Sequence, residues 1–204
     1  MKSLVRQVVK RNTNDVLIRP VTTMSEEDLI SKAFVERALD YLSGHYLPKI
    51  ERCLEKLTDE QIWWRPNEES NSIGNLILHL CGNARQWIIC GVGGRLDTRV
   101  RDAEFAQREV ISRAELLTLL HSTLAEIETV LRTLDPSTLM VRRQIQGHDV
   151  DLFEAIFHVT EHFSMHAGQI FLLTKLLTGT DLCFYDFEGG APVERWHSGP
   201  SGSS

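Results

Sequence analysis

Four stretches of this sequence repeat apolar residues at intervals of three and four, and this spacing constrains the fold more than any other feature. Such spacing places apolar side chains on one face of an α-helix. The stretches cover residues 25–57, 71–94, 112–134 and 151–179. Outside these stretches, almost no segment has a sequence pattern that requires a β-strand. The sequence therefore predicts an all-α protein, namely an antiparallel four-helix bundle with longer first and third connections.

Polar residues that can cap helices stand where three of these stretches begin. Ser25 precedes a run of acidic residues, which suit the positive end of a helix dipole. Ser112 and Glu115 form a capping box, in which each side chain accepts a hydrogen bond from a free backbone N–H group. Asp151 and Glu154 make a similar pair. The spacing and the caps together predict where the helices start.

Two segments depart from regular helix in the prediction. Gly44 and Pro48 should kink the first helix, because proline lacks an N–H group and clashes with the carbonyl four residues earlier. Residues 139–150, with Gly147 near the centre of their turn, are predicted to form a short hairpin before the last helix.

The chain of 204 residues is long enough to bury one sizeable core, which we place in a single domain over residues 24–190. Residues 1–23 are predicted to be a loosely ordered extension, and residues 191–204, rich in Gly, Ser and Pro, a flexible tail. Translation from Met24 instead of Met1 stays open.

Charge and composition exclude several kinds of partner. The formal net charge is −6, and residues 1–23 hold five basic residues against one acidic residue, so the rest is more acidic still. An acidic body disfavours a nucleic-acid partner, since affinity for the phosphate backbone needs clustered Lys and Arg. No apolar run reaches the roughly 18 residues that span a membrane. The four cysteines form no C-x-x-C pair, which is typical of reduced thiols in a cytoplasmic protein.

Histidines on the second and fourth predicted helices are the strongest functional signal. His158, His162 and His166 recur every four residues, so they lie one above another on the helix. At 100° per residue, His162 and His166 lie nearest the apolar stripe, while His158 lies farther round. His79 sits at the margin of the apolar face of the second helix. Three neutral imidazoles from two helices would leave open coordination positions, as in catalytic metal sites.

Other interpretations of these histidines stay open. They can be hydrogen-bonded core residues. His158, Glu161 and His162 also fit the H-x-x-E-H pattern of a family of zinc peptidases, but only 42 residues follow His162 to supply a third acidic ligand. A carboxylate-bridged di-iron site is disfavoured, because the predicted core lacks E-x-x-H spacing on two helices.

Several polar residues near these histidines are candidates for holding a ring or a substrate. Asn83 and Gln86 continue the stripe that begins at His79, and Gln169 follows His166 by three residues. Together with His158, they are predicted to support the site or its substrate. For Asn83 and Gln86, ordinary hydrogen bonds between helices are an equal alternative.

Aromatic and basic residues outside the helices give weaker hypotheses. Trp63 and Trp64, followed by an arginine, can border the mouth of a site, although packing is the more usual role of such residues. Arg95, Arg99 and Arg101 can bind an anionic cosubstrate, but basic loop residues are usually solvated.

The segments NSIGNLILHLCGNARQWI, GGRLDTRVRDAEF and HVTEHFSMHAGQIFLLTKLL together resemble the DinB/YfiT-like superfamily, in a branch of unknown function. The resemblance covers residues 25–190. Its motifs are a histidine on the second helix and H-x-x-x-H followed by A-G-Q-I on the fourth. They are short individually but specific in combination and order.

The resemblance implies a four-helix bundle, often homodimeric, that binds zinc or nickel through three histidines. By motif position these correspond to His79, His162 and His166. Some members transfer the thiols bacillithiol, mycothiol or glutathione, and others are named as hydrolases or damage-inducible proteins. We therefore expect a metal-dependent enzyme acting on a small molecule, either a thiol-dependent S-transferase for small electrophiles or a hydrolase. The alternative is a non-catalytic bundle that binds a metal or ligand.

Overall fold

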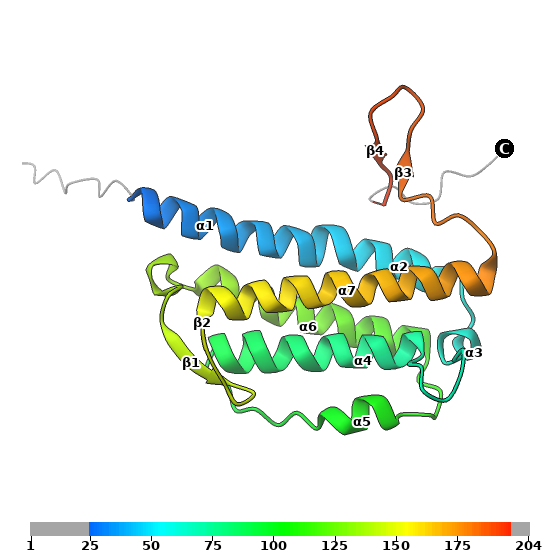
Figure 1. The fold of residues 1–204 in the computed structure, drawn as a ribbon, viewed down its shortest axis with the longest axis horizontal. Coiled ribbons are helices and arrows are strands. Elements are labelled where there is room, and N and C mark those ends of the chain that lie inside the picture. Colours follow the sequence, from blue (N-terminus) through cyan, green and yellow to red (C-terminus); the bar gives the residue numbers. More distant parts are fainter. Residues whose placement is uncertain (1–24, 197–204) are drawn as a thin grey trace, which may run out of the picture.

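The computed structural model describes residues 25–196 and shows a bundle of four long helical segments (Figure 1). This confirms the predicted all-α fold. The first segment is α1 (Glu26–Leu39), continued by the π-helical η1 (Asp40–Tyr46) and α2 (Leu47–Glu55), and the second is α4 (Ile73–Ala84) with the π-helical η2 (Arg85–Val92). The third and fourth are α6 (Arg113–Thr133) and α7 (Leu152–Thr178).

Short elements connect these segments. They comprise two helices of one or two turns, a 3₁₀ helix and two small hairpins: α3 (Asp59–Ile62), α5 (Arg101–Ala106), η3 (Pro136–Thr138), β1 (Arg142–Ile145) with β2 (His148–Asp151), and β3 (Tyr185–Asp186) with β4 (Val193–Glu194). The periodicity did not predict α3, α5 or the C-terminal hairpin, because such short elements do not span a repeat.

The predicted helix starts are present with their caps. The hydroxyls of Ser25, Ser72 and Ser112 accept hydrogen bonds from backbone N–H groups three residues later, and each belongs to a capping box. The Asp151 carboxylate accepts a hydrogen bond from the Glu154 N–H group. Local sequence therefore fixes where the long helices begin.

The structure accommodates Pro48 by widening the helix in front of it. In η1 the Leu47 N–H group donates to the Leu42 carbonyl five residues earlier. Pro48 then falls in the first turn of α2, where its missing N–H group interrupts fewer hydrogen bonds. The irregularity predicted at Gly44 and Pro48 is thus a π-helical stretch within a helix that continues.

Two of the four helical segments run in each direction (Figure 1). Cys81 lies beside Thr123 and Arg85 is paired with Glu126, so α4 and α6 run parallel to each other. Two parallel neighbours need a connection that returns across the bundle, and residues 93–112, including α5, provide it. This second connection lies along α4 and supplies part of the site.

The predicted hairpin before the last helix is confirmed. β1 and β2 are antiparallel and are joined by Gln146 and Gly147, both with positive φ, 52° and 82°. Positive φ at both central residues is the geometry of a tight turn that matches strand twist. The Trp87 indole donates to Gln146 Oε1 at 3.0 Å, which ties the hairpin to η2.

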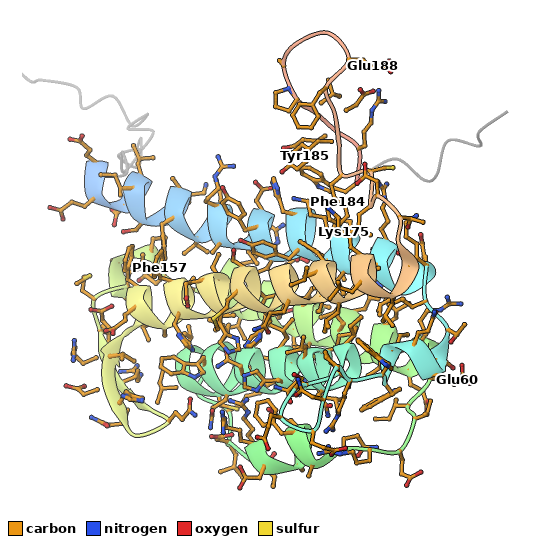
Figure 2. The ribbon with its side chains drawn as sticks, turned by 45° about the vertical axis from the view of Figure 1, so that its right-hand side comes forward. Glu60, Phe157, Lys175, Phe184, Tyr185 and Glu188 are labelled. Carbon is orange, nitrogen blue, oxygen red and sulfur yellow. The ribbon has the colours of Figure 1, made fainter. Side chains whose placement is uncertain are left out.

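The C-terminal part of the domain extends farther than predicted. Residues 191–196 were predicted to belong to a flexible tail, but β4 pairs with β3, and Trp196 is buried and donates to the Gly44 carbonyl at 3.0 Å. Lys49 Nζ lies 3.6 Å from the centre of the Trp196 ring, a cation–π contact. Figure 2 shows Tyr185 near the base of this hairpin. Residues 1–24 and 197–204, where the predicted extension and the rest of the tail fall, lie outside the described residues.

One cluster of buried apolar side chains joins all four helical segments. Phe163 on α7 is among its largest fully buried members. None of the described helices combines the length and the apolar character that a membrane span needs.

Replacing Gly74 by alanine should destabilise the fold by about 1–3 kcal/mol, although alanine favours helix. A Cβ atom at Gly74 would lie 2.7 Å from the Trp63 ring, which is held by a hydrogen bond from its indole to the Ile111 carbonyl. The measurement is urea unfolding. Gly168→Ala on α7 is the control, because nothing lies within 4 Å of its new Cβ. Equal stabilities of the two variants would contradict this account of Trp63 as a packing residue.

Candidate metal centre

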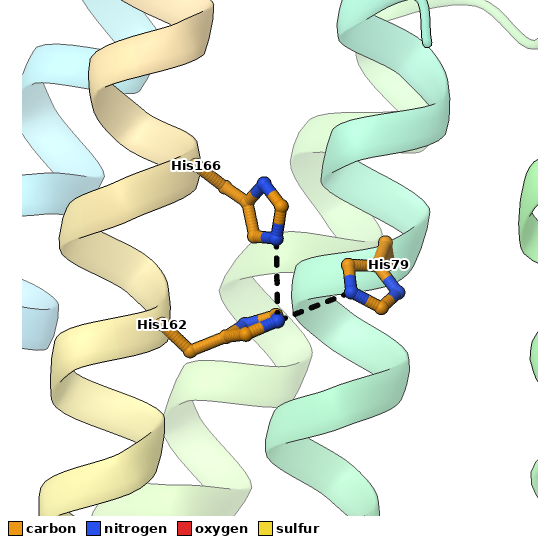
Figure 3. A group of neighbouring side chains, drawn as sticks. All are labelled: His79, His162 and His166. Atoms are coloured by element: carbon orange, nitrogen blue, oxygen red, sulfur yellow. Dashed lines mark hydrogen bonds between the residues drawn. The ribbon is translucent and has the colours of Figure 1, made fainter. Parts of the chain in front are cut away.

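Three histidine side chains meet between α4 and α7 (Figure 3). His79 Nε2 lies 3.1 Å from His162 Nε2, which in turn lies 3.2 Å from His166 Nε2. The candidate ligand atoms of the three residues all lie within 4.8 Å of one another. His79 and His162 are buried, and His166 is half-buried. The structure thus brings together the three residues that the sequence nominated.

Hydrogen bonds on the far side of two rings determine where their protons are. His166 Nδ1 donates to Gln169 Oε1 at 2.7 Å, and His79 Nδ1 donates to Glu104 Oε2 at 2.9 Å. A neutral imidazole holds one proton, so each ring presents an Nε2 lone pair to His162. Gln169 therefore lies where the sequence predicted, against a ring nitrogen of His166.

Burial disfavours the charged form of His162 and His166. Burial, together with the neighbouring His166 and His79, lowers the pKa of His162 to about 3. Burial likewise lowers the pKa of His166. Neutral imidazoles are the form that binds metal.

The arrangement fits a cation better than it fits three histidines alone. A proton on His162 Nε2 can satisfy only one of the two lone pairs that face it, whereas one cation among the three nitrogens satisfies all of them. A cation on Nε2 would place the His162 proton on Nδ1; this atom is buried and lacks a partner among the described residues in either tautomer, so it does not distinguish the two arrangements. The donor set of three imidazole nitrogens suits a divalent metal such as zinc or nickel.

The connection between α4 and α6 supplies a carboxylate that sequence reasoning missed. Glu104 on α5 accepts the hydrogen bond from His79 and forms a two-point ion pair with Arg99, at 2.7 and 2.8 Å. Burial opposes ionisation of Glu104, but hydrogen bonds from Arg99 and His79 outweigh it and lower its pKa. Arg99, which was a candidate for binding an anionic cosubstrate with solvation as the alternative, is only 5% exposed and is paired with Glu104.

Gly82 on α4 makes room for the ion pair of Glu104 and Arg99, and Gln86 on η2 holds Arg99 in place. A Cβ atom at Gly82 would lie 1.9 Å from Glu104 Oε1, so only glycine lets the carboxylate approach. Gln86 Oε1 accepts from Arg99 Nη1 at 2.9 Å, and Gln86 Nε2 donates to Asp97 at 2.7 Å. Gln86 therefore positions Arg99 and does not face the histidines, which differs from its predicted place next to the site.

Replacing Glu104 by glutamine should weaken divalent metal binding about 10- to 100-fold, as is usual for residues that orient a ligand. The substitution removes the negative charge that fixes the Nδ1 proton of His79 and leaves Arg99 unpaired. The measurement is a zinc titration against a chromophoric chelator. Glu126→Gln is the control, because Glu126 also pairs with arginines but lies on α6, away from the histidines. An equal effect of both substitutions would show that Glu104 acts only on stability.

His158 and Asn83 form a separate pair beside the three histidines. Asn83 Nδ2 donates to His158 Nε2 at 3.2 Å, and the His158 ring lies 4.2 Å from the Trp87 ring. Glu161 is exposed. Since His158 is engaged by Asn83 and stands outside the group of three, this geometry does not favour the zinc-peptidase interpretation.

An open cavity of about 390 Å³ begins at His79 and His162 and extends to the β1–β2 hairpin. Its wall includes Asn83, Trp87 and His158. Trp63 and Trp64 are absent from this wall, and Arg95 is paired with Glu126. A cavity of this size suits a small molecule.

Comparison with known proteins places the chain in a family. A family model described as "Protein of unknown function (DUF1572)" matches residues 29–185. No curated protein matches. A conserved protein from Enterococcus faecalis is similar in structure, with a TM-score of 0.57 at 15% identity over 78% of this chain and 100% of that chain. A DinB-like protein from Bacillus cereus ATCC 10987 gives a TM-score of 0.53 at 16% identity over 67% of this chain and 88% of that chain.

Both likenesses concern the fold, and both agree with the helical bundle described above. Because the family model spans most of the described residues, the assignment covers the three histidines and the connection with Glu104. The chain belongs to the DUF1572 family.

Proposed function

We propose that this protein is a divalent-metal-dependent enzyme in which His79, His162 and His166 hold zinc or nickel. The main support is the convergence of three histidine Nε2 atoms, with two of the three residues, His79 and His162, lining an open cavity. Three protein ligands leave coordination positions open, and the wall of the cavity offers space for a small molecule next to them. The most plausible reaction is transfer of a low-molecular-weight thiol to a small electrophile, with hydrolysis as the second choice.

A divalent ion bound there would lower the pKa of a thiol or a water that binds to it. The chain's own residues supply the geometry. Glu104 and Gln169 hold the His79 and His166 rings so that their Nε2 atoms face His162. Asn83 and His158 line the space next to these rings, where they can orient a substrate through hydrogen bonds.

The thiol of such a reaction would come from a small molecule. Burial raises the pKa of Cys53 to about 11 and that of Cys81 to about 12, so both stay protonated near neutral pH. Neither cysteine lines the cavity. Protonated, buried thiols are poor nucleophiles.

Cobalt-substituted protein gives a direct test. Addition of 2-mercaptoethanol should produce a thiolate-to-cobalt absorption band, and the zinc form should then consume thiol faster in the presence of a small alkylating agent. His79→Ala should show neither effect. Metal binding without a thiolate band and without turnover would favour the alternative, a non-catalytic metal-binding bundle.

A further inference from the structure

The cavity beside the histidines contains a buried polar atom that the protein leaves unsatisfied. Asn83 is 4% exposed, its Nδ2 donates to His158, and its Oδ1 has no partner among the described residues. A buried acceptor without a partner is destabilising, because it has lost its hydrogen bonds to water. Asn83 belongs to the cavity wall, so a ligand in the cavity can supply the missing donor.

The charged residues of the cavity wall are two arginines and one glutamate. Arg99 is neutralised by Glu104. Arg101 is exposed, and no carboxylate among the described residues pairs with it; its guanidinium lies 4.8 Å from the Phe105 ring. Glu154 is the one carboxylate of the wall, and it lies in the first turn of α7, beside the hairpin.

Arg101 and Glu154 balance each other in the wall, so the proposed metal would give the site a positive charge. Imidazole ligands do not offset the two charges of a divalent ion, and Glu104 is already shared with Arg99. A molecule that reaches the open positions of the ion and also contacts Arg101 is therefore favoured if it carries negative charge. The ring of Trp87 and the side chain of Val150 give the same wall an apolar part.

We propose that the cavity binds a small anionic molecule, whose negative group pairs with Arg101 and whose hydrogen-bond donor is accepted by Asn83 Oδ1. The inference deepens the proposed function, on which it rests, by naming the class of substrate. It assigns specificity to Arg101, a residue outside the metal centre.

Mandelate and phenylethylene glycol are matched probes, because both carry a hydroxyl group that can donate to Asn83 Oδ1 and they differ in the carboxylate, which is a CH₂OH group in the glycol. Titration calorimetry on the zinc-loaded protein should show mandelate binding about three- to tenfold more tightly than the glycol. Arg101→Gln should reduce that preference, because only the charge of the ion then favours the carboxylate. Glu154→Gln, which removes the opposite charge from the same wall, should leave it intact or increase it. Arg37→Gln, on α1, repeats the change in net charge away from the cavity.

Equal binding of the two probes, binding of neither, or a preference that Arg101→Gln leaves unchanged would overturn the inference. Zinc content, measured on each sample, separates this failure from failure of the proposed function. A protein that binds zinc but shows no preference for the carboxylate disproves only the anionic substrate. A protein that binds no zinc disproves the metal centre, and titration of the metal-free form still tests the role of Arg101.

Discussion

Replacing His162 by alanine is expected to abolish binding of zinc or nickel and to leave the helical content unchanged. His162 is the central member of the group, 3.1 Å from His79 and 3.2 Å from His166 through their Nε2 atoms. Without it, the two remaining ligands lie on different helices. We expect the affinity to fall about 10³-fold or more, beyond the 10- to 100-fold typical of residues that only orient a ligand. The measurements are a competitive metal titration and circular dichroism.

His158→Ala is the matched control, one helical turn earlier on α7. His158 is hydrogen-bonded to Asn83 and its ring contacts that of Trp87, outside the group of three. The His158→Ala variant should therefore keep the metal. Loss of metal in His158→Ala together with retention in His166→Ala would show that the ligand assignment is wrong.

Replacing Phe163, which directly follows His162 in the sequence, should have the opposite consequence: the fold should lose stability, and metal binding should remain. Phe163 is 0% exposed and packs in the core, with its ring centre 6.4 Å from that of Tyr46. Phe163→Ala should lower the free energy of unfolding by about 3–5 kcal/mol, because it leaves a large cavity. Chemical unfolding measures this loss, and the folded fraction should still bind metal.

The control for Phe163 is Phe157 on the same helix, which is 56% exposed (Figure 2). Phe157→Ala should change the free energy of unfolding by no more than about 0.5 kcal/mol. Similar losses in the two variants would contradict the burial described for α7.

The features that local sequence determines were predictable. Helix spacing, the caps at Ser25, Ser112 and Asp151, and the hairpin about Gly147 depend on neighbouring residues, and the structure contains all of them. The juxtaposition of His79 with His162 and His166 also followed, because the wheel arithmetic places each histidine on or beside the apolar face of its helix.

The approach of Glu104 to His79 and the docking of Trp196 could not be predicted, because both depend on the path of the chain outside the long helices. Glu104 is 25 residues from His79 and lies in the short helix of a connection that crosses the bundle. Spacing within one helix carries no information about that approach. The single local sign was Gly82, a glycine inside a helix, which marks a place where another group comes close. The docking of Trp196 against Gly44 is equally non-local.

The most direct test of the metal centre is elemental analysis of untagged protein purified without chelators, beside His79→Ala prepared in the same way. The account predicts about one equivalent of a divalent metal in the natural chain and none in the variant, with both proteins folded by circular dichroism. Absence of metal from the natural chain even after incubation with zinc or nickel, or equal metal in both proteins, would contradict it.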